Sequence, residues 1–427
     1  MPAKKLKAPK PISPRDGDVL LLVGTMKGLF LLHADRGRRT YRMSGPHFPG
    51  RSVYAAAFDS RAGRHRIWAA PSSMHWGAEL CWSDDFGRTW TRPEAARVRF
   101  PDAAGATLKN IWQISPGLAG DPDSLYCGVE PSALFESRDA GESWSLNEGL
   151  WNHPHRAKWQ PGGGGLCLHT VLVDPRRPGR MVVATSTGGA YRTDDGGRSW
   201  QVKNRGVRAE FMPDPYPEFG QCVHKIAQNA AQPDRLFLQN HWGLYRSDDG
   251  GDSWTDVANG VPSDFGFGVG IHPRDPDTAF VLPLHSDEFR CTPEGKLRVY
   301  RTRNGGRSWQ AMTRGLPQKG ALETVVRDAM TVDSLDPAGV YFGTRSGRLY
   351  ASRDEGGGWK LVADGLPPIV CVKVSVAANT RAKRAANSRP KRAANTRGKR
   401  AVNAKARGRV ARSRPTGPAK RRRRKAA

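Results

Sequence analysis

The sequence predicts an all-β fold, a single seven-bladed β-propeller that is closed by a C-terminal strand and followed by a disordered basic tail. Two observations support the propeller. An eight-residue motif recurs six times and ends in the tryptophans at 90, 144, 200, 254, 309 and 359, a step of 50 to 56 residues. This step matches the length of one four-stranded blade. Strand-like hydrophobic runs also lie before and after each motif, as a blade requires.

The motif has the pattern of a tight hairpin. Its first copy reads Ser83-Asp84-Asp85-Phe86-Gly87-Arg88-Thr89-Trp90. The side chain at the third position accepts hydrogen bonds from free N–H groups, and the glycine at the fifth tolerates a positive φ. We therefore expect a structural rather than a catalytic role for the third-position residues, which are Asp85, Asp139, Asp195, Asp249, Asn304 and Asp354.

We predict seven blades because the chain contains seven copies of the motif. The seventh is a degenerate copy that lies upstream of the other six and reads His33-Ala34-Asp35-Arg36-Gly37. The N-terminal region supplies only three strands, whereas residues 369–374 form a strand without a partner at the other end. We expect this last strand to complete the first blade, because closing the ring removes exposed sheet edges. Residues 323–332 are expected to form the innermost strand of the last blade.

The charge of the chain is concentrated at its ends. The whole chain of 427 residues carries a formal charge of +28, and residues 377–427 hold 20 Lys/Arg and no Asp or Glu. The predicted domains are a basic disordered arm (1–16), the propeller (17–376) and a disordered Lys/Arg/Ala-rich tail (377–427). The tail is expected to bind nucleic acid or another polyanion through phosphates. A solvated tail with incidental contacts is the alternative.

The remaining composition indicates a soluble, cytoplasmic monomer without a membrane partner. The chain has no run of eighteen apolar residues, and its basic N-terminal residues lack the apolar centre of a secretory signal. The six cysteines are scattered singly, so we expect them to be reduced and buried. No metal site and no cofactor are predicted.

The repeated motif resembles the Asp-box, or bacterial neuraminidase, repeat. This repeat occurs in sialidases, in xyloglucanase-type glycoside hydrolases, in sortilin-like receptors and in photosystem II assembly factors. The six copies cover about 330 residues of the chain. The resemblance implies a propeller of that superfamily and leaves open which member the chain is most similar to.

In a four-stranded blade, the Asp boxes occupy one face of the ring, and the long loops and the starts of the innermost strands lie on the other. Long loops on a rigid scaffold carry function in most folds. We expect a ligand, either a glycan or another small molecule, to bind in the central funnel on this second face. The predicted ligand-binding residues are His75, Trp76, Trp112, His153, His155, Trp159, His169, His224, His241, Trp242, His285 and Arg327. Hydrogen-bonded packing is the alternative role for the histidines.

Whether the chain is an enzyme stays open at this stage. A glycoside hydrolase needs two carboxylates that flank the scissile bond. The candidates on the loop face are Glu130, Asp214, Glu218, Asp287, Glu288 and Asp328. A true sialidase is disfavoured, because sialidases have six blades and an Arg-Ile-Pro signature, and the nearest string here is Arg66-Ile67-Trp68. The competing hypothesis is a non-catalytic assembly or interaction scaffold that the basic tail tethers to nucleic acid.

Overall fold

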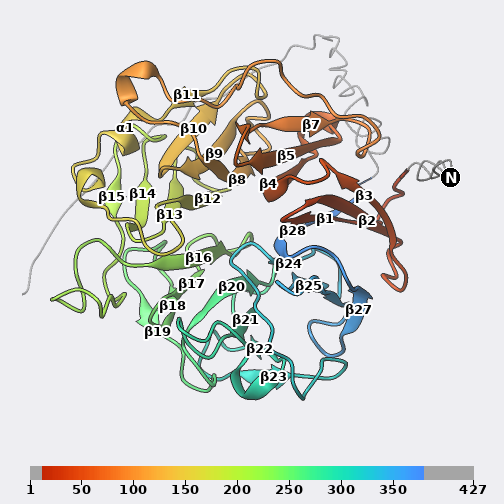
Figure 1. The fold of residues 1–427 in the computed structure, drawn as a ribbon. Coiled ribbons are helices and arrows are strands. Elements are labelled where there is room, and N and C mark those ends of the chain that lie inside the picture. Colours follow the sequence, from red (N-terminus) through yellow and green to blue (C-terminus); the bar gives the residue numbers. More distant parts are fainter. Residues whose placement is uncertain (1–11, 379–427) are drawn as a thin grey trace, which may run out of the picture. The chain divides into compact units, whose positions relative to one another are not determined.

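The computed structural model describes residues 12–378, and in this range the strands form seven antiparallel sheets arranged in a ring (Figure 1). We number these sheets as blades 1 to 7 in chain order and letter the strands of each blade a to d from the axis outward. The predicted all-β, seven-bladed propeller is confirmed. Residues 1–11 of the predicted arm (1–16) and residues 379–427 of the predicted tail (377–427) lie outside the described residues.

The first three blades contain twelve named strands. Blade 1 is formed by β28 (Ile369–Val376), β1 (Val19–Thr25), β2 (Gly28–Ala34) and β3 (Arg42–His47). Blade 2 is formed by β4 (Ser52–Asp59) and β5 (Arg66–Ser73), with β6 (Gly77–Ala78) and β7 (Cys81–Ser83) both paired with β5. Blade 3 is formed by β8 (Asn110–Pro116), β9 (Leu125–Glu130), β10 (Ala133–Ser137) and β11 (Ser145–Leu146).

The other four blades each contain four consecutive strands. Blade 4 is formed by β12 (Leu168–Val173), β13 (Met181–Thr185), β14 (Gly189–Thr193) and β15 (Gln201–Val202). Blade 5 is formed by β16 (Val223–Gln228), β17 (Leu236–Asn240), β18 (Leu244–Ser247) and β19 (Thr255–Asp256). Blade 6 is formed by β20 (Gly266–Ile271), β21 (Ala279–Pro283), β22 (Val299–Thr302) and β23 (Gln310–Met312). Blade 7 is formed by β24 (Met330–Val332), β25 (Val340–Gly343), β26 (Leu349–Ser352) and β27 (Lys360–Ala363).

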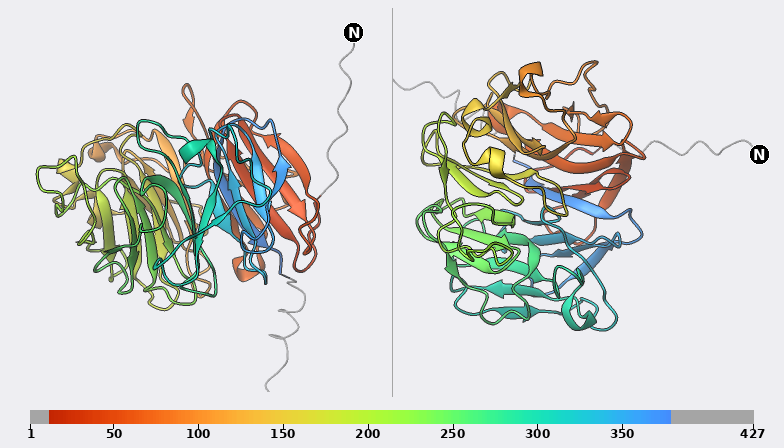
Figure 2. Two further views of the ribbon diagram at one scale, coloured as in Figure 1. Left: turned by 90° about the horizontal axis from the view of Figure 1, so that it is seen from below. Right: turned by 60° about the vertical axis from the view of Figure 1, so that its left-hand side comes forward.

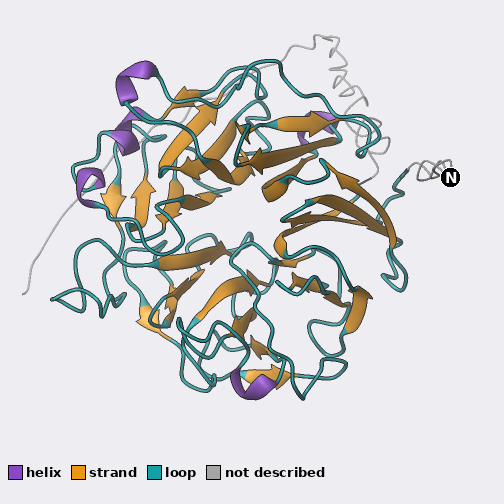
Figure 3. Ribbon diagram, viewed as in Figure 1, coloured by secondary structure: helices purple, strands orange, loops and turns teal. Residues whose placement is uncertain are grey.

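Between residues 12 and 378, helical structure is confined to single turns in the loops. Figure 3 shows these turns towards the outside of the ring. They are α1 (Glu148–Trp151), η1 (Arg61–Gly63), η2 (Asp102–Ala104), η3 (Arg156–Lys158) and η4 (Pro293–Gly295). None of the helices between residues 12 and 378 has the length and apolar character that crossing a lipid bilayer requires.

The C-terminal strand closes the ring as predicted. Strand β28 pairs antiparallel with β1, and both views in Figure 2 show it among the strands of the first and last blades. The pairing ends in two backbone hydrogen bonds of 2.8 Å, from Gly17 N to the Ala377 carbonyl and from Ala377 N to the Asp18 carbonyl. The innermost strands of successive blades then contact one another around the whole ring. The propeller therefore has no free edge at the point where the chain begins and ends.

Apolar side chains fill the space between neighbouring blades. Ala57 of blade 2 and Ile114 and Phe135 of blade 3 belong to one buried cluster, and Val182 of blade 4 packs with Ile226 of blade 5 in another. Each blade is therefore stabilised by its neighbours as well as by its own ladder. This is the packing expected of a repeat fold in which one unit cannot bury both of its faces.

Each of the six repeated motifs closes its own c–d hairpin. In the c–d hairpin of blade 5, the Ser247 hydroxyl accepts a hydrogen bond from Gly251 N at 2.8 Å and donates one to Asp249 Oδ1 at 2.7 Å. Asp249 Oδ1 also accepts from Ser253 N at 3.0 Å. Asn304 makes the equivalent contact with Ser308 N at 3.0 Å. These hydrogen bonds are internal to the turn, so the aspartates hold the backbone and do not face a ligand.

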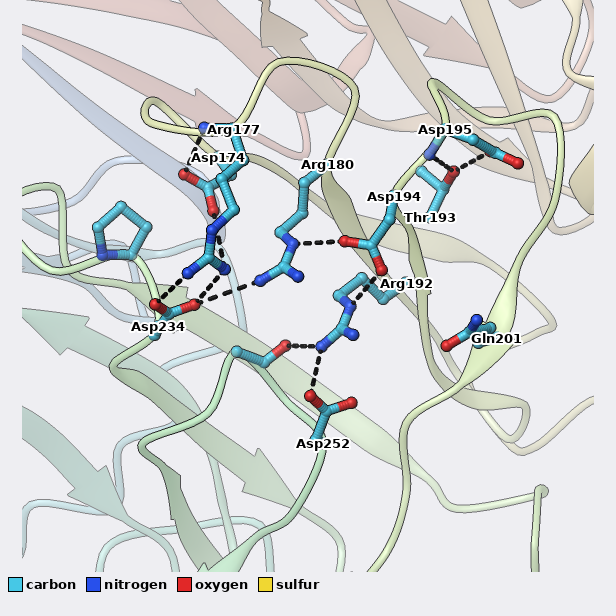
Figure 4. A network of polar contacts seen from close by, with 12 residues as sticks. Asp174, Arg177, Arg180, Arg192, Thr193, Asp194, Asp195, Gln201, Asp234 and Asp252 are labelled. Atoms are coloured by element: carbon cyan, nitrogen blue, oxygen red, sulfur yellow. Dashed lines mark hydrogen bonds and ion pairs between the residues drawn. The ribbon is translucent and has the colours of Figure 1, made fainter.

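On the face of the ring that carries the repeated motifs, ion pairs join blade 4 to blade 5 (Figure 4). Asp234, between β16 and β17, accepts from Arg177 at 2.7 Å and from Arg180 at 3.3 Å. Arg192 of β14 is buried and bridges Asp194 of its own blade, at 3.1 Å, to Asp252 of the next, at 3.0 Å. Exposed pairs contribute little individually, but the shared carboxylates link two separate sheets.

Three local expectations differ from the structure. The innermost strand of blade 7 is only Met330–Val332, because the preceding residues leave the ladder and Asp328 forms an isolated parallel bridge with Cys371. The fourth strand of blade 2 is reduced to one bridge, Trp82 with Thr91. All six cysteines are free, as expected, but Cys222 and Cys291 are half-buried rather than buried.

Candidate functional site at the mouth of the ring

The inner strands share one irregularity close to their first residue. In six of them the ladder slips at the second or third residue, so that one residue bulges out of register. Such bulges re-aim side chains at the rims of barrels and beside active sites. The bulged residues are Tyr54, Trp112, His169, His224, Phe267 and Val370. Because inner strands start on the loop face, these side chains mark the mouth of the ring there.

Trp112 is the centre of one half of this mouth. Its ring lies 4.7 Å from that of Tyr54, and the Arg327 guanidinium lies 5.4 Å from its centroid. Its indole N–H donates to Glu130 Oε2 at 3.0 Å. Among residues 12–378, neither Glu130 nor Arg327 forms an ion pair. A carboxylate and a guanidinium that have no ion-pair partner in the described part of the chain therefore flank one aromatic ring.

Phe267 is the centre of the other half. His224 stacks on it with ring centroids 4.4 Å apart, and the guanidinium groups of Arg327 and Arg290 lie 5.9 and 5.6 Å from its centroid. Arg327 also donates to Cys167 Sγ at 3.4 Å. Burial raises the pKa of the Cys167 thiol to about 11, although Arg327 opposes this shift. Arg327 thus contacts both halves of the mouth, from the segment just before β24.

The two inner-strand histidines join neighbouring blades. His169 Nε2 bonds the Val223 carbonyl of blade 5 at 2.9 Å, and His224 Nδ1 bonds the Gly266 carbonyl of blade 6 at 2.6 Å. Burial, reinforced by Arg327, lowers the pKa of both rings well below the ordinary value. His169 also uses its other nitrogen, towards the Thr170 hydroxyl at 3.0 Å, and its ring is wholly enclosed. The contacts of His169 therefore connect blade 4 to blade 5.

Three residues that carry metal-ligand atoms meet on blade 5. Cys222 precedes β16, His224 lies in it and His241 follows β17; one ligand atom of each lies within 4.8 Å of the others. Asp287 of blade 6 bonds His241 Nε2 at 3.1 Å, and this hydrogen bond lowers the pKa of Asp287. Sequence reasoning selected both histidines but missed Cys222. Its signal is the Cys-x-His spacing, which keeps the two side chains close together at the start of β16.

A second group of predicted residues gathers away from the mouth, around Tyr191 of β14. The Tyr191 hydroxyl accepts from Trp159 Nε1 at 3.0 Å and contacts His155 Nδ1 at 3.2 Å. His153 packs against both His155 and Tyr191. Glu218 lies 3.6 Å from His155 Nε2. Since Tyr191 belongs to a c strand, these residues cover the body of blade 4 and are not brought to the central mouth.

The other predicted residues lie on the surrounding loops. Trp242 stacks beside His241, with centroids 4.3 Å apart, and beside Phe211. Trp76 is 77% exposed, next to an exposed His75 in the β5–β6 loop. His285 and Glu288 are exposed in the loop after β21, and Asp214 accepts a hydrogen bond from Tyr216 N in its own turn. These side chains form a rim rather than a single contact site.

Asp328 has a different environment from the other candidate acids. It is buried, and its Oδ1 accepts from Lys225 of β16 at 2.8 Å and from Lys373 of β28 at 2.6 Å. Burial alone would raise its pKa, but the two ammonium groups outweigh burial and hold the pKa well below the ordinary value. Asp328 is thus ionised, and its two ion pairs connect blade 7 to blades 5 and 1.

Sequence comparison finds relatives over part of the chain. A probable oligoxyloglucan-reducing end-specific xyloglucanase of Neosartorya fischeri is 26% identical over 262 residues, which are 53% of this chain and 30% of the relative. The oligoxyloglucan-reducing end-specific xyloglucanase of Emericella nidulans is 25% identical over 217 residues, 44% of this chain and 25% of the relative. The chain thus spans less than a third of the length of these relatives. No family model matches it.

Solved structures share the fold at low sequence identity. An ancestral GH74 enzyme has a TM-score of 0.50 and 15% identity, over 73% of this chain and 38% of its own. A putative 6-phosphogluconolactonase from Bacteroides uniformis has a TM-score of 0.52 and 9% identity, over 84% of this chain and all of its own. The chain is therefore a seven-bladed β-propeller that resembles xyloglucanases in sequence over about half of its length.

Proposed function

We propose that the propeller binds an oligosaccharide at the mouth of the ring. The observation that carries this proposal is the Trp112 group, in which an aromatic ring is flanked by Glu130 and Arg327, two charged side chains without ion-pair partners among the described residues. Small-molecule sites combine aromatic surface with a few converging polar groups. A sugar ring offers an apolar face for stacking and hydroxyls for the carboxylate and guanidinium. Trp76 and Trp242 extend the aromatic surface along the rim.

The sequence relatives support a glycan over other small molecules, because both are named for oligoxyloglucan. Hydrolysis needs a second carboxylate opposite Glu130. Asp328 is committed to two lysines and Asp287 to His241, so the contacts favour binding without catalysis. The proposed function is therefore a glycan-binding propeller.

Replacing Trp112 with Ala, or Arg327 with Met, is expected to weaken oligosaccharide binding at least about tenfold, which is about 1.4 kcal/mol. Calorimetric titration of the full chain with xyloglucan oligosaccharides measures this, with cello-oligosaccharides for comparison and reducing-sugar release followed in the same samples. Arg138→Met is the matched control, because Arg138 also lies over an aromatic ring, Tyr126, but beside an Asp box. Absence of oligosaccharide binding, or equal losses in both arginine variants, would contradict the proposal.

The composition of residues 377–427 favours a second function, in which the propeller is a head held on nucleic acid. Twenty cations without a single acid would neutralise phosphates irrespective of sequence. We expect the full chain to shift DNA and RNA in gels at low salt, with affinity falling steeply as salt rises. A chain ending at Ala378 should lose this binding and keep its oligosaccharide binding. Equal nucleic-acid affinity in both chains would refute a role for the tail.

A further inference from the structure

Cys222, His224 and His241 are arranged like part of a zinc site. In tetrahedral zinc sites the Zn–S and Zn–N bonds are about 2.3 and 2.0 Å long, which places the sulfur and nitrogen about 3.5 Å apart. The distance from Cys222 Sγ to His224 Nε2 is 3.7 Å. The whole cluster lies within 4.8 Å, so a small movement of the half-buried His241 would bring its nitrogen to the same separation. The backbone already ties the two segments, through His241 N and the Cys222 carbonyl at 3.0 Å.

Both imidazoles have a hydrogen-bond partner on one ring nitrogen, which leaves the other nitrogen as the possible metal ligand. His224 Nδ1 donates to the Gly266 carbonyl at 2.6 Å, which leaves the lone pair on Nε2, the atom facing Cys222. His241 Nε2 donates to Asp287 Oδ2 at 3.1 Å, which leaves the lone pair on Nδ1. Metal-ligating histidines almost always donate their other ring N–H to a carboxylate, a backbone carbonyl or water. The tautomers needed for a metal are therefore set by the surrounding residues.

The cluster is also open on one side. His224 is buried, whereas Cys222 and His241 are half-buried and border the mouth. Three protein ligands with one accessible position are typical of zinc sites that also bind water or a substrate. The charges of Arg290 and Arg327 both act on Cys222 and His224, so an anionic group would be the favoured occupant of the fourth position.

We propose that Cys222, His224 and His241 bind one zinc ion at the mouth, with its fourth coordination position open to water or an anionic ligand group. Zinc would bind whether or not an oligosaccharide does, because no residue of the Trp112 group is a ligand. A ligand held at the mouth would lie beside the ion, since Phe267 contacts both His224 and Arg327. Asp287 is the positioning residue that orients His241.

The test is a calorimetric titration of the chelator-treated full chain with Zn²⁺. One zinc per chain is expected, and Cys222→Ser and His241→Gln should each weaken binding at least about tenfold. Asp287→Asn should weaken it by about tenfold, the range seen for residues that orient a ligand. His224 is left unchanged because its bond to Gly266 also joins two blades.

Cys291→Ser and His65→Gln are the controls, because Cys291 lies on a loop-face segment of blade 6 and the exposed His65 lies between β4 and β5 on the opposite face, both outside the cluster. They should bind zinc like the unaltered chain. Co²⁺ gives a second readout, since a thiolate-to-cobalt charge-transfer band should appear in the unaltered chain and be lost in Cys222→Ser. Absence of zinc binding, or a zinc affinity that Cys222→Ser does not change, would overturn the site.

Discussion

A chain that ends at Pro368 is expected not to fold, because it lacks β28, the innermost strand of blade 1. This strand buries Ile369, Val370 and Val372, each at most 2% exposed. Burying one aliphatic side chain contributes about 1.5–3 kcal/mol, so the three together contribute about 5–9 kcal/mol. This is comparable to the total stability of a typical domain, about 5–15 kcal/mol. Far-UV circular dichroism and thermal unfolding of the soluble fraction measure the effect.

A chain that ends at Ala378 is the control. It keeps all of β28 and both backbone hydrogen bonds between Ala377 and the Gly17–Asp18 segment. It should unfold in one cooperative transition at the temperature of the full chain. If the chain ending at Pro368 shows the same transition, ring closure by β28 is not what stabilises the propeller.

Asp328→Ala is expected to lower the free energy of unfolding by up to about 3 kcal/mol, because it removes a buried carboxylate and leaves the half-buried ammonium groups of Lys225 and Lys373 without this counter-charge. Urea unfolding measures this. Asp84→Ala is the control, since Asp84 pairs with Arg66 at an exposed position and should cost no more than about 1 kcal/mol. Replacing Asp328, Lys225 and Lys373 together by apolar residues should restore much of the stability. No recovery in the triple variant would show that the ion pairs are not the cause.

The ion pairs of Asp328 also predict that the stability of the fold depends on pH. The folded-state pKa of Asp328 is lower than the value of about 3.9 in an unfolded chain, because two ammonium groups stabilise its carboxylate. Its contribution to stability is therefore complete above about pH 4 and is lost as the pH falls towards the folded-state pKa. The stability difference between the unaltered chain and Asp328→Ala should shrink below pH 4. A difference that stays constant down to pH 2 would contradict this assignment.

The architecture could be predicted from the sequence because its determinants are local. Each hairpin is closed by hydrogen bonds within a few residues, such as Ser247 to Gly251 and Asp249 to Ser253, so it leaves a readable motif. The shortened β24 could not be predicted in the same way. The residues before β24 bond to the closing strand β28 instead, since Val372 N donates a backbone hydrogen bond of 2.8 Å to the Asp328 carbonyl. That contact joins residues far apart in the sequence.

The site was predicted only in part for a related reason. Trp112 and His224 were selected as polar or aromatic residues at the starts of inner strands, and they lie at the mouth. Tyr54 and Phe267 occupy equivalent bulges but were missed, because a bulge depends on pairing register and not on residue type. His155 was selected for its long loop, yet that loop folds back over Tyr191. Loop length alone therefore does not show which way a loop turns.

The slipped residues at the starts of the inner strands have a consequence for how this molecule can change. A residue displaced from the ladder contributes little to the strand pairing, so Tyr54 and Trp112 are expected to be exchangeable while the scaffold persists. His169 and His224 differ, because each also bonds a backbone carbonyl of the next blade. Binding specificity can therefore change by single replacements at the first two positions.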